Sequence, residues 1–223
     1  MADAALQRRN MVESQVRPSD ITDRRITRAM LDVPREAYVP KAQASVAYGD
    51  LDVRLCEAAP GTPQRVLMPA RVFAKLLQMC SIEPHDDVLI VGAGLGYSSA
   101  IVAELAKSVT ALEENEALAA AARKNLESQG VTSADVHTGA LVAGVPSKTP
   151  FDVIIIEGAA AHVPKALLDQ LGPDGRLAVI TAEGAAGKAT LWRRHAGGFT
   201  HSEAFDASAA VLPGFAKEPA FSF

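Results

Sequence analysis

In the middle of the chain, short continuous runs of apolar residues, typical of buried strands, alternate with stretches in which apolar residues recur at helical spacing. Residues 88–91 form a short, mostly β-branched apolar run, which is typical of a strand buried on both faces. Apolar residues then recur at helical spacing over residues 100–106, and a second apolar run covers residues 109–112. This order predicts a strand, a turn, a helix and a strand, which together make half of a nucleotide-binding α/β unit.

The same alternation continues to the end of the chain. The overall pattern is βαβαβαβ, followed by two β segments in hairpin order around Gly197 and Gly198. We therefore expect an α/β fold of Rossmann-like type, with a doubly wound, mostly parallel sheet and a late antiparallel strand pair. The elements expected after the first unit are a helix over residues 116–129, strands over 136–138, 151–156 and 177–181, and a helix over 164–171.

The first 84 residues have a different character. Residues 1–45 are helical in pattern and polar, and residues 46–69 are irregular, with Pro60, Pro63 and Pro69 preventing a long helix. A clear amphipathic helix follows over residues 70–82. We expect a helical and loop-rich extension over residues 1–84, packed with a nucleotide-binding domain over residues 85–223 into one compact unit.

Composition narrows the functional classes. The chain has 223 residues and a net charge of −4, so it has no global basic field for nucleic acid. It has no long apolar run for a membrane span, and its first 15 residues lack the apolar segment of a secretory signal. Two cysteines without metal-ligand spacing indicate no metal site and a reducing, cytoplasmic setting. The oligomeric state stays open.

Three glycines at alternate positions follow the first strand, at Gly92, Gly94 and Gly96. A ligand approaches the backbone closely only where side chains are missing, and glycine also permits the unusual torsions of a tight turn. Glu113 lies 21 positions after Gly92, at the tip of the neighbouring strand, where a carboxylate can accept both hydroxyls of a ribose. The alternative is a tight strand–helix turn with no ligand.

The spacing of the glycines selects among nucleotide ligands. The dinucleotide fingerprint has glycine at its first, third and sixth positions. In this chain the sixth position is Tyr97 and the fifth is Gly96. A G-x-G-x-G turn followed by an acid at the second strand tip resembles an S-adenosylmethionine (AdoMet) methyltransferase.

Further segments make the resemblance narrower. Over most of its length the chain resembles the protein-L-isoaspartate O-methyltransferase family. The glycine turn and the Gly-Pro-Asp-Gly-Arg-Leu segment at residues 172–177 occur in many methyltransferases. The segment at residues 35–40 and the three alanines at 159–161, after the fourth strand, are more specific to this family. The matching segments are residues 33–40, 47–50, 88–103, 151–152, 159–161, 163–164 and 167–180.

The resemblance implies an AdoMet cofactor and a protein or peptide acceptor. Family members methylate the side-chain carboxylate of an isoaspartyl residue in damaged protein, which leads to its repair. Because this nucleophile is already an anion, positioning it in line with the sulfonium methyl supplies much of the effect. We identify no catalytic residue. The residues expected to bind the cofactor are Gly92, Ala93, Gly94, Gly96, Tyr97, Glu113, Glu114, Ala140 and Leu141.

The chain departs from the family pattern at three positions. Leu67 stands where the acceptor loop carries a serine, Ile90 where the first strand carries an acid, and Ala140 where an aspartate reaches the adenine side. A leucine cannot donate a hydrogen bond to the acceptor. Three functions therefore stay open: the isoaspartyl methyltransferase, an AdoMet methyltransferase with another acceptor, and a binding or regulatory protein without turnover.

Two charged residues are assigned to the acceptor side together with Leu67 and Met68. Arg65 can hold an acidic acceptor, although we interpret it first as a surface arginine. Glu157 follows the fourth strand and faces either the cofactor or the acceptor, in place of a small hydroxyl residue. Its alternative is a solvated charge beside a turn.

Overall fold

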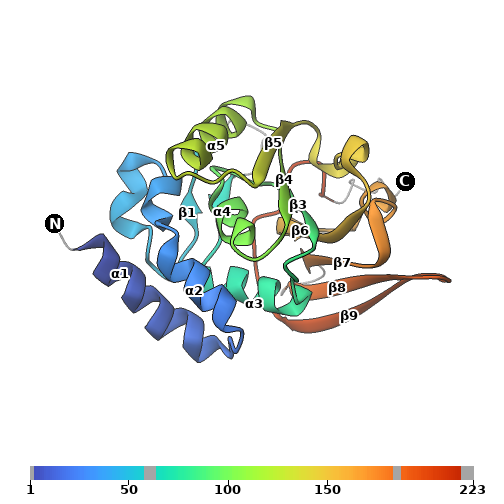
Figure 1. The fold of residues 1–223 in the computed structure, drawn as a ribbon, viewed down its shortest axis with the longest axis horizontal. Coiled ribbons are helices and arrows are strands. Elements are labelled where there is room, and N and C mark those ends of the chain that lie inside the picture. Colours follow the sequence, from blue (N-terminus) through green and yellow to red (C-terminus); the bar gives the residue numbers. More distant parts are fainter. Residues whose placement is uncertain (1–2, 58–63, 183–186, 217–223) are drawn as a thin grey trace, which may run out of the picture.

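The computed structural model describes residues 3–57, 64–182 and 187–216, with helices packed against a twisted sheet (Figure 1). Pro60 and Pro63, which we expected to break a helix in the irregular loop, lie outside the described residues. No helix of the described part is long and apolar enough to cross a membrane.

A seven-stranded sheet confirms the expected α/β fold. Its order is β5-β4-β3-β6-β7-β8-β9; the first five strands run parallel, and the pairs β7–β8 and β8–β9 are antiparallel. The strands of this sheet are β3 (Asp87–Val91), β4 (Ser108–Glu113), β5 (Ala134–Thr138), β6 (Phe151–Ala160), β7 (Leu171–Thr181), β8 (Lys188–His195) and β9 (Gly198–Asp206). A separate antiparallel pair joins β1 (Val53–Arg54) and β2 (Val66–Leu67).

Helices cover one face of the sheet more heavily than the other (Figure 1). The larger hydrophobic cluster runs from Met11 to Leu191 and includes apolar residues of every helix except α6. The smaller cluster, on the other face, includes Leu167 of α6 and the late residues Leu212 and Phe215. The helices are α1 (Ala4–Met11), α2 (Arg24–Asp32), α3 (Ala70–Cys80), α4 (Tyr97–Ala103), α5 (Glu116–Ser128) and α6 (Lys165–Leu168), with shorter turns at Val12–Val16, Arg17–Ser19, Arg35–Tyr38, Lys41–Val46, Leu141–Ala143 and Pro146–Lys148.

The amphipathic helix before the sheet has the expected position and faces. It forms α3, and Val72, Phe73 and Leu76 on its apolar side are buried. Because α3 contacts β6, β7 and β8, the N-terminal extension shares the core of the sheet. The division of the chain at residues 84 and 85 stays a prediction.

The strand register sets the position of the candidate acids. Val91 of β3 pairs with Leu112 of β4 on one side and with Ile156 of β6 on the other. The next residues along the three strands therefore lie side by side at the carboxyl edge of the sheet. Because side chains alternate along a strand, Glu113 and Glu157 both belong to the face covered by α3 and α4.

The region between β6 and β7 differs from the sequence-based expectation. The helix expected over residues 164–171 is only α6, and β7 begins at Leu171 instead of residue 177. Phe151 pairs with Leu171, and a register shift separates this pair from Val153 with Arg176. Gly172, Pro173 and Gly175, which lie between the expected helix and the expected strand, are thus an irregular part of β7, in which Asp174 has a φ of 58°.

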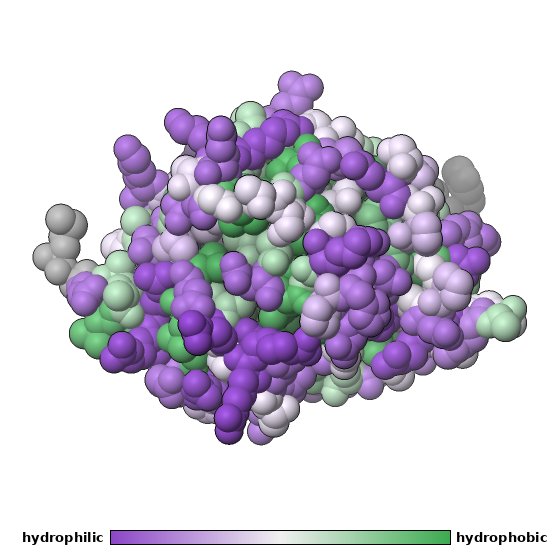
Figure 2. Space-filling view, in the orientation of Figure 1, coloured by the Kyte–Doolittle hydropathy of each residue, from purple (hydrophilic) through white to green (hydrophobic). Residues whose placement is uncertain are grey.

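The surface shows no single large apolar patch on the face in view. Hydrophilic side chains cover most of this face, and hydrophobic residues are visible in separate patches (Figure 2). Two large hydrophobic side chains of the described residues are exposed, Leu6 and Leu51.

A buried ion pair fixes the end of α3 to the sheet, and its loss should destabilise the protein. Arg176 of β7 lies 2.6 Å from Asp86, whose side chain is 2% exposed, and also donates to the carbonyl oxygen of Ser81. Arg176→Met leaves the Asp86 carboxylate buried without its cation, so we expect the free energy of unfolding to fall by about 3 kcal/mol.

Urea unfolding measures this loss. Arg17→Met is the matched control, because Arg17 pairs with Glu13 while both side chains are about half exposed; it should cost about 0.5 kcal/mol or less. Equal losses in the two variants would show that the Asp86 pair has no special weight.

Candidate active site

The glycine turn between β3 and α4 is held against the neighbouring strand. Gly92, Gly94 and Gly96 all have positive φ, at 87°, 55° and 96°. The backbone N–H groups of Gly92 and Ala93 both donate to the carbonyl oxygen of Leu112, at 2.9 and 3.1 Å. The turn thus presents bare main chain beside the tip of β4.

Glu113 points into this turn, as the sequence predicts. Its side chain is fully buried, and its Oε2 accepts a hydrogen bond from the Gly94 N–H at 2.8 Å. Oε1 accepts from the Asn115 N–H at 3.1 Å, and the Asn115 side chain also caps α5. The structure therefore brings together the carboxylate and the glycine turn on which the sequence hypothesis depends.

Arg65 is buried, so its interpretation as a surface arginine is wrong. The residue is 6% exposed, and its Nη2 lies 2.6 Å from Oε2 of Glu113. Its backbone oxygen accepts from the N–H of Leu55, which continues the β1–β2 pairing by one residue. A fully desolvated arginine requires such a partner, and Glu113 supplies it from 48 positions away.

Two leucines cover the turn from other parts of the chain. A Cβ added at Gly94 would lie 2.5 Å from Cδ1 of Leu55, and one at Gly92 would lie 3.0 Å from Cδ1 of Leu212. Leu212 also packs over Gly158, where an added Cβ would lie 2.6 Å from its Cγ. A nucleoside fits this place chemically, because the carboxylate matches a ribose diol and bare backbone matches close approach. Its entry requires that Leu55, Leu212 and Arg65 move.

Glu157 is buried rather than solvated, so the alternative reading of a charge in water beside a turn is wrong. It is 5% exposed and accepts a hydrogen bond from the hydroxyl of Ser98 in α4. Burial raises the pKa of the Glu157 carboxyl to about 7, while Ser98, Arg65 and Arg35 oppose this rise. Its Oε1 has no hydrogen-bond partner among the described residues.

Sequence reasoning gave no role to Arg35, which the structure places in the same polar cluster. Arg35 is fully buried, and it donates from Nε to the carbonyl oxygen of Ala47 and from Nη2 to that of Met68, both at 2.7 Å. Its guanidinium carbon also lies 4.8 Å from the centre of the Tyr97 ring. The available signal was its place in the segment at residues 35–40, which is more specific to the family that the sequence resembles.

The remaining predicted residues are spread around this centre. Tyr97 is 1% exposed, and its ring packs against Tyr38 and Phe73 in the core. The ring therefore does not face the turn, and only the backbone of Tyr97 is placed to contact a cofactor. Leu67 and Met68 are buried at 4% and 2%. Of the residues assigned to the cofactor, Leu141 is buried, whereas Glu114 and Ala140 are exposed. Their cofactor contacts stay predictions.

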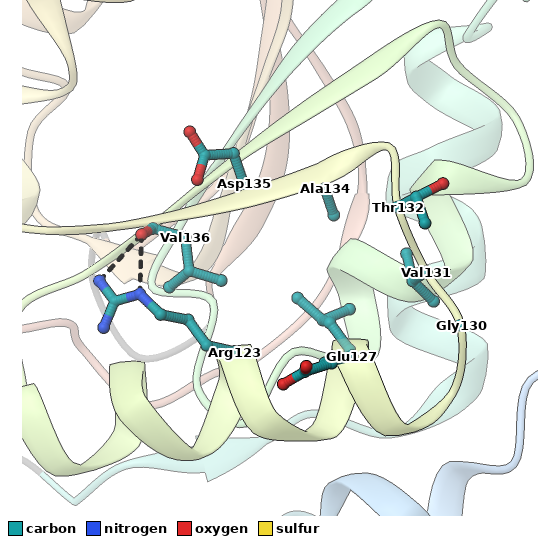
Figure 3. A pocket seen from close by; sticks show the side chains of 9 residues that line it. Arg123, Glu127, Gly130, Val131, Thr132, Ala134, Asp135 and Val136 are labelled. Atoms are coloured by element: carbon teal, nitrogen blue, oxygen red, sulfur yellow. Dashed lines mark hydrogen bonds between the residues drawn. The ribbon is translucent and has the colours of Figure 1, made fainter.

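A pocket of about 250 Å³ lies elsewhere, between α5 and β5 (Figure 3). Arg123 crosses it and donates to the carbonyl oxygen of Val136 and to the hydroxyl of Thr138. None of the predicted site residues lines this pocket. Arg123 is already hydrogen-bonded there, and the other charged side chains that line the pocket are the carboxylates of Glu127 and Asp135.

Comparison with known proteins identifies relatives over most of the chain. A family model described as protein-L-isoaspartate(D-aspartate) O-methyltransferase matches residues 6–206. A protein-L-isoaspartate O-methyltransferase of Methylorubrum extorquens is 39% identical over 86% of this chain and 80% of that protein, and one of Methanoculleus marisnigri is 38% identical over 77% and 75%.

Solved structures have the same fold at lower identity. One protein-L-isoaspartate O-methyltransferase superposes with a TM-score of 0.81 at 20% identity, over 93% of this chain and 66% of that chain. Another, described as a putative enzyme of this kind from Plasmodium falciparum in complex with S-adenosyl-L-homocysteine, has a TM-score of 0.77 at 18% identity, over 91% of this chain and 96% of that one.

The buried Glu157 carboxyl should make stability depend on pH. Its pKa is about 7 in the folded protein against an ordinary value of 4.5, so between these values the folded state holds one more proton than the unfolded state. The free energy of unfolding should therefore fall as pH rises through this window, by on the order of 3 kcal/mol in total. Glu157→Gln cannot ionise and should lose this part of the pH dependence.

Urea titrations at pH 5, 6, 7 and 8 compare the two proteins. Ser98→Ala removes a hydrogen bond that lowers the pKa of Glu157, so its pH window should extend upward. A constant difference between the wild type and Glu157→Gln across the series would contradict the raised pKa.

Proposed function

The chain belongs to the protein-L-isoaspartate O-methyltransferase family, and we propose that it methylates the side-chain carboxylate of isoaspartyl residues in proteins. It is an AdoMet-dependent methyltransferase. AdoMet, when bound, supplies a methyl group on a positively charged sulfur. This chain's own residues must then hold the nucleoside, orient the acceptor and exclude water.

The observation that supports this function most strongly is the position of Glu113. Its carboxylate is buried at the tip of β4 and hydrogen-bonded to the backbone of the glycine turn. We propose that it accepts the hydroxyls of the ribose, with Gly92, Gly94 and Gly96 beneath the rest of the nucleoside. Leu55 and Leu212 must leave the turn to admit the nucleoside, and as neighbouring apolar side chains they are then suited to keep water away from the reacting atoms.

The chemistry of the acceptor explains why no general base is assigned. A carboxylate is already the reactive anion at neutral pH, so the protein only needs to place it against the methyl group. The described residues at the carboxyl edge offer positive charge for this purpose in Arg35 and Arg65. We also propose a reducing, cytoplasmic setting, because Cys56 and Cys80 are both unpaired thiols.

A second function is favoured by Leu67 and Glu157. Leu67 is 4% exposed and has no hydroxyl for the acceptor, and Glu157 adds a carboxyl group at the carboxyl end of β6. A carboxyl group with a raised pKa can accept a proton from an alcohol or amine acceptor. An AdoMet methyltransferase for such an acceptor is therefore the alternative, and a cofactor-binding protein without turnover is the third possibility.

The role of Glu113 is tested by its affinity for S-adenosylhomocysteine. Glu113→Gln keeps the shape of the side chain but replaces charge-assisted hydrogen bonds to the ribose with neutral ones, so we expect the dissociation constant from calorimetry to rise about 10- to 100-fold. Glu127→Gln, on the exposed side of α5, is the control and should bind like the wild type. Unchanged affinity in Glu113→Gln would remove Glu113 from the cofactor site.

The acceptor is tested by transfer of a labelled methyl group. We expect label from AdoMet in a peptide with one isoaspartyl residue and none in the same peptide with a normal aspartyl residue. The ester should be lost in mild base, as carboxyl esters are. Label on a base-stable position would favour the alcohol or amine acceptor, and binding of AdoMet without transfer to either peptide would favour the protein without turnover.

A further inference from the structure

We propose that Arg65 binds the carboxylate of the acceptor, and that Glu113 holds Arg65 until the ribose of the cofactor takes its place. The proposal rests on the proposed function and names the residue that recognises its substrate. It depends on three observations: the unused donors of Arg65, the lone pairs of Glu113 and the charges around both residues.

Arg65 has more hydrogen-bond donors than its surroundings use. A guanidinium carries five N–H donors, and Nη2 is the nitrogen that reaches Glu113. Nε and Nη1 are both buried and have no hydrogen-bond partner among the described residues. Buried donors without partners are costly, so their presence beside a ligand site points to a ligand that completes them.

The contact of Arg65 with Glu113 is incompatible with a bound ribose. Oε2 of Glu113 already accepts from the Gly94 N–H and from Arg65, and Oε1 accepts from the Asn115 N–H. A carboxylate has about four acceptor positions, so one remains, whereas the two hydroxyls of a ribose need two. Nη2 of Arg65 also lies only 3.5 Å from the place of an added Cβ at Gly92, so it stands over the turn itself. The nucleoside therefore displaces Arg65.

The displaced guanidinium stays among groups that favour an anion. The charges of Arg65 and Arg35 lower the pKa of Glu157, and the charge of Glu113 raises it. With burial, the pKa is about 7, so the Glu157 carboxyl is partly protonated near neutral pH. Positive charge thus exceeds negative charge in this buried cluster. An entering carboxylate balances that excess and supplies acceptors for the unused nitrogens of Arg65. Arg65 lies two positions before Leu67 along the same extended segment, so it takes the place of the missing hydroxyl as the polar group of the acceptor loop.

A structure of the wild-type protein with S-adenosylhomocysteine tests the release of Arg65. We expect the ribose on Glu113 and Arg65 beyond hydrogen-bond distance from it. Arg65 still paired with Glu113 in that complex would overturn the proposal. This result does not depend on the acceptor, so it is obtained even if the wild type fails to methylate an isoaspartyl peptide and the proposed function falls.

Kinetics with the isoaspartyl peptide test the second step. In Arg65→Met we expect KM for the peptide to rise about 10- to 100-fold, with a smaller change in the calorimetric affinity for S-adenosylhomocysteine. Arg65→Lys keeps the charge beside Glu113, guards against loss of folding and should be intermediate. Arg71→Met is the control, because Arg71 pairs with Asp50 at the surface, and it should behave as the wild type.

Two other results would reject the assignment. A normal KM in both Arg65 variants would exclude contact with the acceptor. A loss of S-adenosylhomocysteine affinity with an unchanged KM would show that Arg65 binds the carboxylate of the cofactor itself instead of the acceptor.

Discussion

The ion pair between Arg65 and Glu113 joins the N-terminal extension to the central sheet, next to the glycine turn. Glu113 ends a central strand, and Arg65 belongs to the segment that leads into β2 and α3. Both side chains are removed from water, so each needs the other while no ligand is bound. The same carboxylate fixes the backbone of the glycine turn through Gly94. Stability without a ligand and access for a ligand therefore depend on one contact, and whatever binds at Glu113 must also rearrange the N-terminal segment.

The two buried acids occupy similar positions in the sheet but have different hydrogen-bond partners. Glu113 ends β4 and Glu157 lies in β6, the strands on either side of β3, and both belong to the same face of the sheet. Glu113 is paired with a guanidinium and two backbone N–H groups, which stabilise its charge. Glu157 has the hydroxyl of Ser98 as its hydrogen-bond partner, so burial dominates and raises its pKa. The sheet places the acids, and the segments packed on it decide which hydrogen-bond partners each one has.

Periodicity in the sequence predicted the fold, because it records which faces are buried. The strand before the glycine turn, α3 and α5 were predicted close to their observed bounds, and the late hairpin was predicted at its observed place in the chain. The position of Glu113 beside the turn also followed, since parallel strands end at one edge. Contacts between distant segments left no such record: Arg65 reaches Glu113 across 48 positions, and Leu212 packs on Gly92 from near the end of the chain. The irregular start of β7 was missed because Gly172, Pro173 and Gly175 have the composition of a turn, whereas the strand pairs with β6 on both sides of this irregular stretch, at Leu171 and again from Arg176.

Leu67 has no hydroxyl for the acceptor, yet an apolar residue at this position is compatible with a carboxylate acceptor. A carboxylate acceptor brings its own negative charge and nucleophile, so the site needs a cation to hold it and apolar walls to keep water out, not a base. Among the described residues around Glu113, the buried cations are Arg35 and Arg65, and Leu67 and Met68 contribute to the apolar core beside them. Arg35 donates from Nε and Nη2 to two backbone carbonyl oxygens, those of Ala47 and Met68, and only its Nη1 has no partner among the described residues. Arg65 keeps unused donors and is held by a partner that the cofactor replaces, so recognition by charge can substitute for recognition by a hydroxyl.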